Sequence, residues 1–327
     1  MALPQDTVKE APSHVPSPEE LPALYASGMS LNEIAAQVGR SQTYVRKRLL
    51  KQGISLRTRG QGSRAYRERH PEYMNRLYKW KVNDPGVVTQ ARLLMMTLII
   101  TEGCLSKHTV QFTNTQEQLH QRFRDAARDA YGEITLGRNG LNSRISSSLV
   151  LRDLEPHIRG KVFSEQCLRL ITASNELCVK VCRIIADTEG SMIISVRRAP
   201  RNFTVEFRVV LASTNQAFSR QIQTMLASLG MQSNINRVGV HIMRKEHIKA
   251  FVQMVGFTPG LKVIRKKAGY GVWYGHDKSI MTKVFLWISD RQDDARGNPK
   301  KFVFADCKTR EQTVERLMSI YRQVCGG

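Results

Sequence analysis

The sequence predicts an α+β protein in which a pseudo-twofold duplicated αββαββ core follows a small all-α domain at the N-terminus. The order helix, strand, strand, helix, strand, strand occurs twice between residues 91 and 255, which favours an internal duplication. The spacing of apolar residues along the second helix of each copy also repeats, at an offset of 99 residues. The residues that share this spacing are Leu119, Phe123, Ala126 and Ala130 in the first copy and Phe218, Ile222, Met225 and Leu229 in the second.

Composition places the chain among basic globular proteins. Of its 327 residues, 41% are hydrophobic, and 50 Lys and Arg against 28 Asp and Glu give a net charge of +22. From Arg40 to Lys81 there are 13 basic residues and two acids, a distribution that favours a nucleic-acid partner. No apolar run is long enough to span a bilayer, and no signal or transit pattern opens the chain. With six scattered cysteines that we predict to be reduced, we expect a cytoplasmic, nucleoid-associated protein without a membrane partner.

Three short helices are predicted in residues 18–58, after a Pro-rich tail (1–17) that we expect to be disordered. The first helix stops at Gly28, Ser30 and Glu33 form a capping box for the second, and Ser41 caps the third. The residues predicted to face inward are Leu21, Leu24, Tyr25, Leu31, Ile34, Ala35, Val38, Val45, Leu49 and Leu50.

This pattern resembles a helix-turn-helix of the resolvase and invertase type, which implies that the third helix enters the major groove of double-stranded DNA. The outer face of that helix carries Gln42, Thr43, Tyr44, Arg46, Lys47, Arg48 and Lys51. Among these, we assign Gln42, Thr43 and Arg46 to base edges and Lys47, Arg48 and Lys51 to phosphates.

We predict a basic linker at residues 59–87. The stretch from Leu56 to Arg64, which overlaps the start of this linker, is small, flexible and basic. It looks like a flexible arm suited to a minor groove, with Arg57 and Arg59 as contacts. The alternative for the whole N-terminal region is a three-helix packing module that binds no DNA.

Two apolar helices end on Thr-Glu-Gly, in "MMTLIITEG" (Met95–Gly103) and "CRIIADTEG" (Cys182–Gly190). The first copy then predicts short strands to Asn114, a helix over 116–131, a strand pair and a helix from Leu149. The second predicts strands over 191–198 and 203–212, a helix over 215–229, a strand pair and a helix over 245–255. A glycine lets the chain leave each helix without a Cβ penalty.

These motifs and this element order resemble the LAGLIDADG homing endonuclease family over roughly residues 88–290. The resemblance implies a first half at 88–160, a second half at 161–262 and a helical extension at 263–327 that packs on the core. It also implies that the two motif helices pack together at the pseudo-twofold axis, so that Glu102 and Glu189 meet as catalytic residues. The chain would then act as a monomer that cleaves both DNA strands at a long site.

Metal chemistry follows from the same resemblance. Phosphodiester hydrolysis needs a nucleophilic water and a stabilised leaving oxygen, which metal ions held by carboxylates supply. Hard oxygen ligands suit Mg²⁺, which usually takes one or two protein carboxylates together with phosphates and water. The implied metal site comprises Glu102, Glu189 and the adjoining Gly103 and Gly190.

The third and seventh motif positions depart from the small residues of the family. They hold Thr97 and Thr101 in the first motif and Ile184 and Thr188 in the second. Because Ile184 is bulky, the carboxylate spacing could be too wide for cleavage. The alternatives are therefore a non-catalytic DNA-binding regulator on the same fold, or an RNA-binding maturase that assists splicing.

The two strand pairs that follow the motifs are predicted to be unequal. The motif acids lie 87 residues apart and the following helices 99, so the second hairpin is 12 residues longer. Its length suits a DNA groove, and the short first hairpin would leave part of the recognition to the helix-turn-helix. The basic residues assigned to DNA in the core are Lys107, Arg138, Arg144, Arg197, Arg198, Arg201, Arg208, Lys262 and Lys266.

Overall fold

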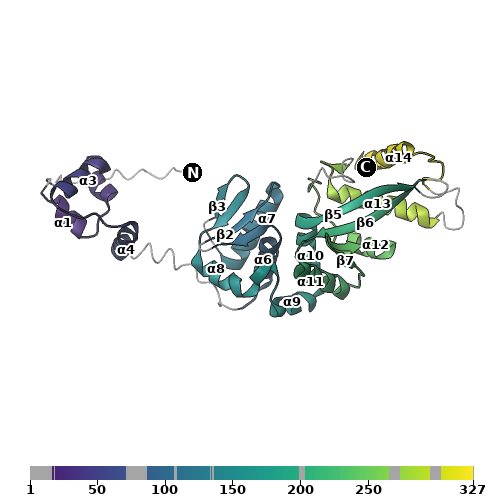
Figure 1. Cartoon of the computed structure of the whole chain (residues 1–327), viewed down its shortest axis with the longest axis horizontal. Helices are drawn as coiled ribbons and strands as arrows, with labels where there is room; N and C mark the ends of the chain where they lie inside the picture. The colour runs from purple at the N-terminus through teal and green to yellow at the C-terminus, as the bar shows by residue number, and fades with distance from the viewer. Residues whose placement is uncertain are drawn as a thin grey trace, which may run out of the picture. The chain divides into compact units, whose positions relative to one another are not determined.

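The computed structural model describes residues 17, 19–70, 87–106, 109–132, 134, 136–198, 203–264, 273–294 and 303–326. The chain divides into two compact units, Met1–Lys81 and Val82–Gly327 (Figure 1). Most of the predicted tail, part of the predicted linker (71–86), and Lys107, Arg201 and Lys266 lie outside the described residues. Among the described residues, no helix has the length and apolar character needed to cross a membrane.

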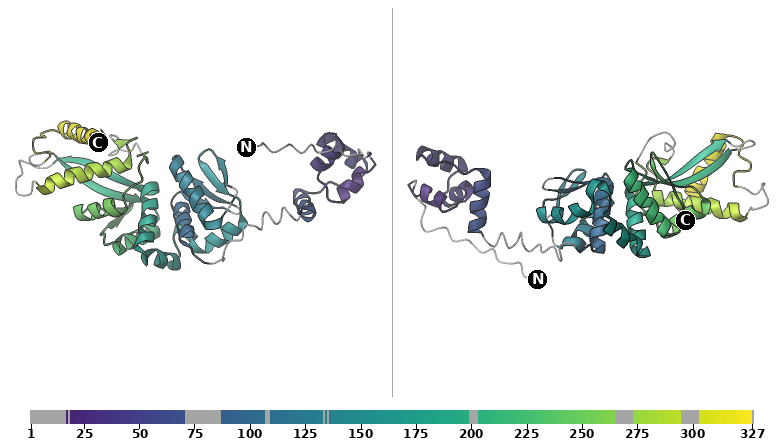
Figure 2. Two further views of the ribbon diagram at one scale, coloured as in Figure 1. Left: turned by 180° about the vertical axis from the view of Figure 1, so that it is seen from behind. Right: turned by 60° about the horizontal axis from the view of Figure 1, so that its bottom comes forward.

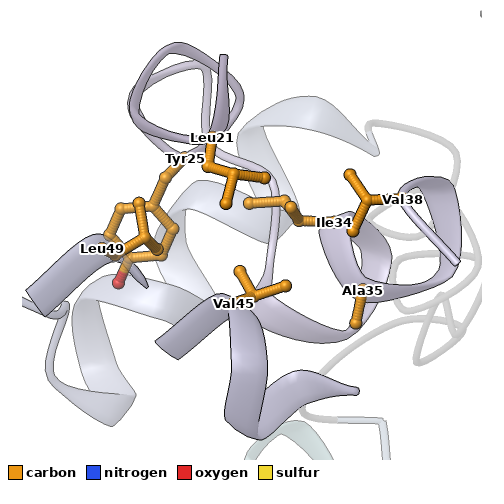
Figure 3. Close-up of a cluster of buried hydrophobic side chains, with 7 residues drawn as sticks. All are labelled: Leu21, Tyr25, Ile34, Ala35, Val38, Val45 and Leu49. Atoms are coloured by element: carbon orange, nitrogen blue, oxygen red, sulfur yellow. The ribbon is translucent and has the colours of Figure 1, made fainter. Parts of the chain in front are cut away.

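The first unit contains the three predicted helices, α1 (Leu21–Ala26), α2 (Leu31–Gln37) and α3 (Gln42–Lys51). Both sides of the Ser30–Glu33 capping box form, and Ser41 accepts from the backbone N–H of Tyr44. The side chains that build the core are Leu21, Tyr25, Ile34, Ala35, Val38, Val45 and Leu49 (Figure 3).

Leu50 is a correction, because its side chain is 51% exposed. Leu49 is fully buried in the core, whereas Leu50, about 100° further round the helix, points toward solvent. Ile54 and Leu56, which follow α3, pack against the core instead. Leu24 and Leu31 lie at its edge and are only partly buried.

A fourth helix, α4 (Arg59–Arg69), replaces the flexible arm that the sequence predicted over Leu56 to Arg64. Thr58 and Gln61 form a second capping box, which the prediction overlooked in favour of the flexible glycines around it. The end of α4 is tied to α2, because Glu33 accepts from Arg69 at 3.5 Å and lies 3.2 Å from His70 Nε2.

The second unit contains the predicted duplication. The first half comprises α6 (Gln90–Glu102), β1 (Gly103–Leu105), β2 (Val110–Thr113), α7 (Glu117–Tyr131), β3 (Leu136–Asn139), β4 (Asn142–Ile145) and α8 (Ser148–Leu154). The second half comprises α10 (Asn175–Glu189), β5 (Gly190–Arg198), β6 (Phe203–Ala212), α11 (Gln216–Ser228), β7 (Asn234–Asn236), β8 (Gly239–Ile242) and α12 (Lys245–Met254). Each half folds into an antiparallel four-stranded sheet, with strand orders β1-β2-β4-β3 and β5-β6-β8-β7.

The predicted difference between the two hairpins is confirmed. Strands β5 and β6 pair over nine positions, from Gly190↔Leu211 to Arg198↔Phe203. Strands β1 and β2 pair over three, from Gly103↔Phe112 to Leu105↔Val110. The second hairpin therefore extends well beyond the helices that support the first part of its sheet, as Figure 2 shows.

Three further helices complete this unit. Helix α9 (Glu165–Thr172), which the sequence analysis missed, connects the halves, packs on α10 and α11, and buries Cys167 and Ile171. The two predicted C-terminal helices are α13 (Lys278–Asp294) and α14 (Arg310–Gly326). Both contact the long hairpin, and the ring of Phe285 on α13 lies 5.2 Å from that of Phe207 on β6. The extension thus supports the strands that exceed the reach of the duplicated helices.

Candidate active site and nucleic-acid interface

The two motif helices, α6 and α10, pack directly against each other. The threonines that replace small residues fit this contact because each donates its hydroxyl to a carbonyl of its own helix. Thr97 binds Leu93 O at 2.7 Å, Thr101 binds Thr97 O at 3.0 Å and Thr188 binds Ile184 O at 2.8 Å. No hydroxyl is therefore left unsatisfied in the interface, and Ile184 is accommodated at 4% exposure.

Glu102 and Glu189 are the last residues of these helices, and both are partly buried. Neither helix has a basic residue in its last turn. The negative end of each helix dipole thus coincides with a carboxylate, an arrangement that favours a bound cation.

The glycines after the two acids are required by close packing. A Cβ on Gly103 would lie 2.6 Å from Gln111 O, and one on Gly190 would lie 2.4 Å from Ala186 O. Their φ angles are −114° and −86°, so neither is in the left-handed region. The predicted role of avoiding a Cβ clash is confirmed, but its cause is the approach of the strand to the last helical turn.

The expected Mg²⁺ requires oxygen ligands, and the two terminal carboxylates supply them. Within the described residues, no group of three or more His, Cys, Asp or Glu side chains is placed to hold a metal ion. That excludes a closed cage there, but Mg²⁺ commonly binds through one or two carboxylates and completes its shell with water and substrate phosphates. Glu102 and Glu189, each the last residue of a motif helix, provide carboxylates of the kind that such an open site uses.

A pocket of about 450 Å³ lies beside Glu189 and contains two cations that the sequence analysis did not assign. Lys161 and Arg237 line it together with the hydroxyl-bearing Ser213 and Thr214. Lys161 also lines a second pocket, of about 310 Å³, that includes Gly103. It therefore adjoins the ends of both motif helices.

The sequence contains a repeated pattern that could have identified Lys161 as a candidate site residue. "GKV" (160–162) in the first half has a counterpart in "GLKV" (260–263) of the second, at nearly the offset of the duplication. Gly160 and Gly260 both have positive φ, 63° and 88°, so a turn with a left-handed glycine occurs at corresponding places in the two halves.

Each of these turns is bound by the opposite half. Asn215, at the start of α11, donates to Gly160 O at 2.9 Å. Its equivalent 99 residues earlier, Gln116, accepts from Lys262 N at 2.9 Å. The tail of each half thus crosses to the other, which brings Lys161 and Lys262 to the region between the halves.

A buried polar network also joins the halves, and sequence reasoning missed it. Asp187 is fully buried on α10, and its carboxylate accepts from Arg122 of α7 at 2.5 Å. Thr258 donates to the same carboxylate through its backbone N–H (2.8 Å) and its hydroxyl (2.6 Å). Lys278 donates to the Asp187 carbonyl at 2.9 Å. An acid inside an apolar motif was the available signal, because a buried carboxylate needs partners.

On the helix-turn-helix, the assigned residues Gln42, Thr43, Arg46, Lys47, Arg48 and Lys51 are exposed on α3. Tyr44 is only partly exposed and lies between the guanidinium groups of Arg40 and Arg48, at 5.9 and 5.7 Å. Arg57 binds its own domain instead: it donates to Met29 O at 3.2 Å and lies 4.2 Å from the ring of Tyr25. The side chain of Arg59 lies outside the described residues.

The assigned core residues Arg144, Arg197, Arg198 and Lys262 are exposed. Arg197 pairs with Glu206 at 2.8 Å. Arg208 is partly buried, and its charge adds to the effect of burial in lowering the pKa of His241. By strand alternation, Arg197 and Arg208 lie on the same face of the long hairpin, whereas Arg198 lies on the other.

Comparison with known families matches residues 18–64 to a helix-turn-helix domain. Residues 183–256, which include Glu189 and Gly190, match a LAGLIDADG-like domain. This part of the chain is therefore similar to a LAGLIDADG-like domain. The resolvase-like type of the helix-turn-helix stays a prediction.

Similar solved structures include the homing endonuclease I-DmoI in complex with DNA and Mn, with 15% identity, 51% of this chain and 96% of that chain covered, and a TM-score of 0.34. The LAGLIDADG meganuclease I-AabMI bound to uncleaved DNA has 12% identity, 72% and 98% coverage and a TM-score of 0.42. The N-terminal LAGLIDADG domain of DUF199/WhiA has 14% identity, 56% and 91% coverage and a TM-score of 0.32. No curated protein matches the chain.

Proposed function

We propose that the protein is a divalent-metal-dependent endonuclease that binds a long double-stranded DNA site and cleaves both strands as a monomer. The observation that carries the proposal is the pairing of α6 and α10, each of which ends on a glutamate that a sterically required glycine follows. Two equivalent carboxylates in one chain suit two antiparallel strands, one centre for each.

In this proposal, Glu102 and Glu189 hold Mg²⁺, which when bound activates water and neutralises the charge that develops on the leaving oxygen. Lys161 adjoins the ends of both motif helices and offers an ammonium group to the scissile phosphates. Arg197 and Arg208 on the long hairpin, and the exposed face of α3, bind the flanking DNA. In α3, Gln42, Thr43 and Arg46 contact base edges.

The test is cleavage of a randomised duplex library by the full chain, with Mg²⁺ and then with Ca²⁺. We expect Mg²⁺-dependent breaks at a defined sequence, and loss of cleavage in Glu102→Gln and Glu189→Gln while binding persists. The matched control is Glu176→Gln, an exposed glutamate at the start of α10 that pairs with Lys180 at 2.6 Å. Cleavage that survives in both motif variants would refute the assignment.

The second candidate is a DNA-binding regulator without nuclease activity, which the departure of the motif at Thr97, Thr101 and Ile184 from the small residues of the family favours. It predicts sequence-selective retention of duplexes in the same library, with no breaks in Mg²⁺. Binding by itself does not separate the two candidates, because both predict affinity that falls with salt.

A further inference from the structure

The duplication produces two equivalent grooves beside the motif helices, and the described residues cover one of them. In the second half, α9 packs along α11 and α10 and reaches α6 (Figure 1). Cys167 Sγ of α9 lies 4.0 Å from Met96 Sδ of α6. Gln221 of α11 binds both backbone groups of Phe163, just before α9: it accepts from the N–H at 3.0 Å and donates to the carbonyl at 2.7 Å.

The equivalent groove of the first half is open within the part of the chain that the structure describes. It is a pocket of about 550 Å³ between α7 and α10, lined also by α6. The motif helices repeat after 87 residues and the helices that follow them after 99. Arg183 therefore corresponds to Met96, and Arg122 corresponds to Gln221. Two side chains that hold α9 in the covered groove are thus replaced by arginines in the open one.

Apolar side chains in the open groove lack the cover that their counterparts have. Leu94 of α6 and Val179 of α10 line the pocket and are partly exposed. Val181, the counterpart of Leu94, is completely buried in the second half. Ala126 and Ile184 extend the same apolar surface between the two exposed side chains and the arginines. Covering this surface with an apolar partner would be favourable, because it removes apolar area from water.

Positive charge at the arginines exceeds the negative charge that balances it. Asp187 accepts from Arg122. Arg183 Nε is buried and has no hydrogen-bond partner among the described residues. Burial and the charge of Arg122 lower the pKa of the Arg183 guanidinium despite the opposing charge of Asp187. An incoming carboxylate would therefore be bound more strongly here than at an exposed arginine.

Two exposed acids continue the groove along α7. Asp125 and Asp129 line the pocket about one and two turns beyond Arg122. The ammonium of Lys180, on the opposite wall, is bound by Glu176 at 2.6 Å. The groove therefore offers positive charge at one end, an apolar wall, and negative charge further along. This pattern is complementary to an amphipathic helix that carries an acid and, further along, a base.

We propose that the groove between α7 and α10 is a docking site for an amphipathic helix of a partner protein, whose acidic side chain binds Arg183 and whose apolar face covers Leu94 and Val179. A helix is the favoured occupant because the same fold covers the equivalent groove with one. Arg183 and Val179 precede Glu189 by six and ten residues, roughly 9 and 15 Å along α10. The docking site is thus separate from the candidate active site, and the inference does not depend on nuclease activity.

The test uses two fluorescent peptides with the sequence of residues 162–174, which contains α9, one with Cys167→Glu and the other with Cys167→Lys. Cys167 contacts the counterpart of Arg183, so the replaced side chain would lie beside Arg183. Fluorescence anisotropy with the full chain gives the dissociation constants. We expect the Cys167→Glu peptide to bind at least about tenfold more tightly, as for a hydrogen bond to a partly buried charge.

Three variants of the full chain locate the binding. Arg183→Met should weaken binding of the Cys167→Glu peptide about tenfold and abolish the preference between the peptides. Val179→Glu should weaken binding of both peptides, because it places a charge on the apolar wall, and it tests the site even where Arg183→Met folds poorly. Arg128→Met is the control, since Arg128 is exposed on α7 and does not line the pocket. Circular dichroism compares the folding of all three.

Four outcomes would overturn the proposal. The first is the absence of saturable binding of either peptide up to about 1 mM, and the second is equal affinity for the two peptides. Self-association of the full chain in sedimentation, lost in Val179→Glu, would make the occupant a second copy. Peptide binding that requires removal of residues 71–86 would make this chain its own occupant.

Discussion

Replacing Asp187 with Asn tests whether the buried network between the halves holds the two motif helices together. Asp187 is completely buried, and its carboxylate accepts three hydrogen bonds, one from Arg122 and two from Thr258. All three neighbours are donors. An asparagine keeps one acceptor oxygen but turns its amide N–H groups toward a donor, so at least one hydrogen bond is lost and another polar group stays unsatisfied.

The expected loss in free energy of unfolding is about 3 kcal/mol. A hydrogen bond to a charged group contributes roughly 1.5–3 kcal/mol, and an unsatisfied buried polar group costs roughly 1–3 kcal/mol. The sum is taken near its lower end because the side chain of Arg122 is 31% exposed and regains hydration when its partner is neutralised.

The assay is urea unfolding of the full chain, followed by the fluorescence of tryptophans that include the buried Trp273 of the C-terminal extension. The matched control is Asp125→Asn, an exposed residue of α7 that accepts from Gln121 at 2.7 Å, with an expected change below about 0.5 kcal/mol. A double-mutant cycle with Thr258→Val should show coupling of about 1 kcal/mol or more. The reasoning is refuted if Asp187→Asn is as stable as its control.

Three further predictions concern local features of both units. Gly190→Ala should destabilise by about 2 kcal/mol because its Cβ would meet Ala186 O, whereas Gly137→Ala, with nothing within 4 Å, should not; urea unfolding compares them. Arg92→Met should cost about 3 kcal/mol in the same assay, because it leaves the buried carboxylate of Asp153, 3.3 Å away, without its cation. Burial acts to raise the pKa of Glu33, but hydrogen bonds from Ser30, with His70 and Arg69, lower it from 4.5 to about 2. The stability that this carboxylate contributes is therefore present above pH 4.5 and lost as the pH falls toward 2. Hydrogen-exchange protection factors of α2 should fall over that range in the unmodified chain and change less in Glu33→Gln.

Features with a local cause were predictable from the sequence. The capping residues Ser30, Glu33 and Ser41 marked two helix starts, because a cap is satisfied within one helical turn. The Thr-Glu-Gly sequences likewise predicted where α6 and α10 end, because the end of a helix also depends on residues within one turn. The offset of 99 residues between α7 and α11 indicated the duplication, since two copies that bury the same helix face must keep the same apolar period.

Competing local signals produced the errors. The glycines of residues 59–64 suggested an arm, but the Thr58–Gln61 capping box and the contacts of Arg69 with α2 outweigh their cost in a helix. Leu50 matched an apolar pattern equally well as Leu49, and only packing decided between them.

The sequence by itself determined the order of elements, the two motif helices with their terminal glutamates, and the basic N-terminal helices, because propensity, capping and apolar period act over a few residues. Only the tertiary structure decided which distant side chains meet. Asp187 and Arg122 lie 65 residues apart and Asp187 and Thr258 lie 71 apart, and no local pattern encodes such a pairing. The same holds for Lys161 and Arg237 beside Glu189, which come together because two strand ends, a turn and a crossing segment converge at one helix end. Such convergence depends on how the halves pack, and packing is a property of the whole fold.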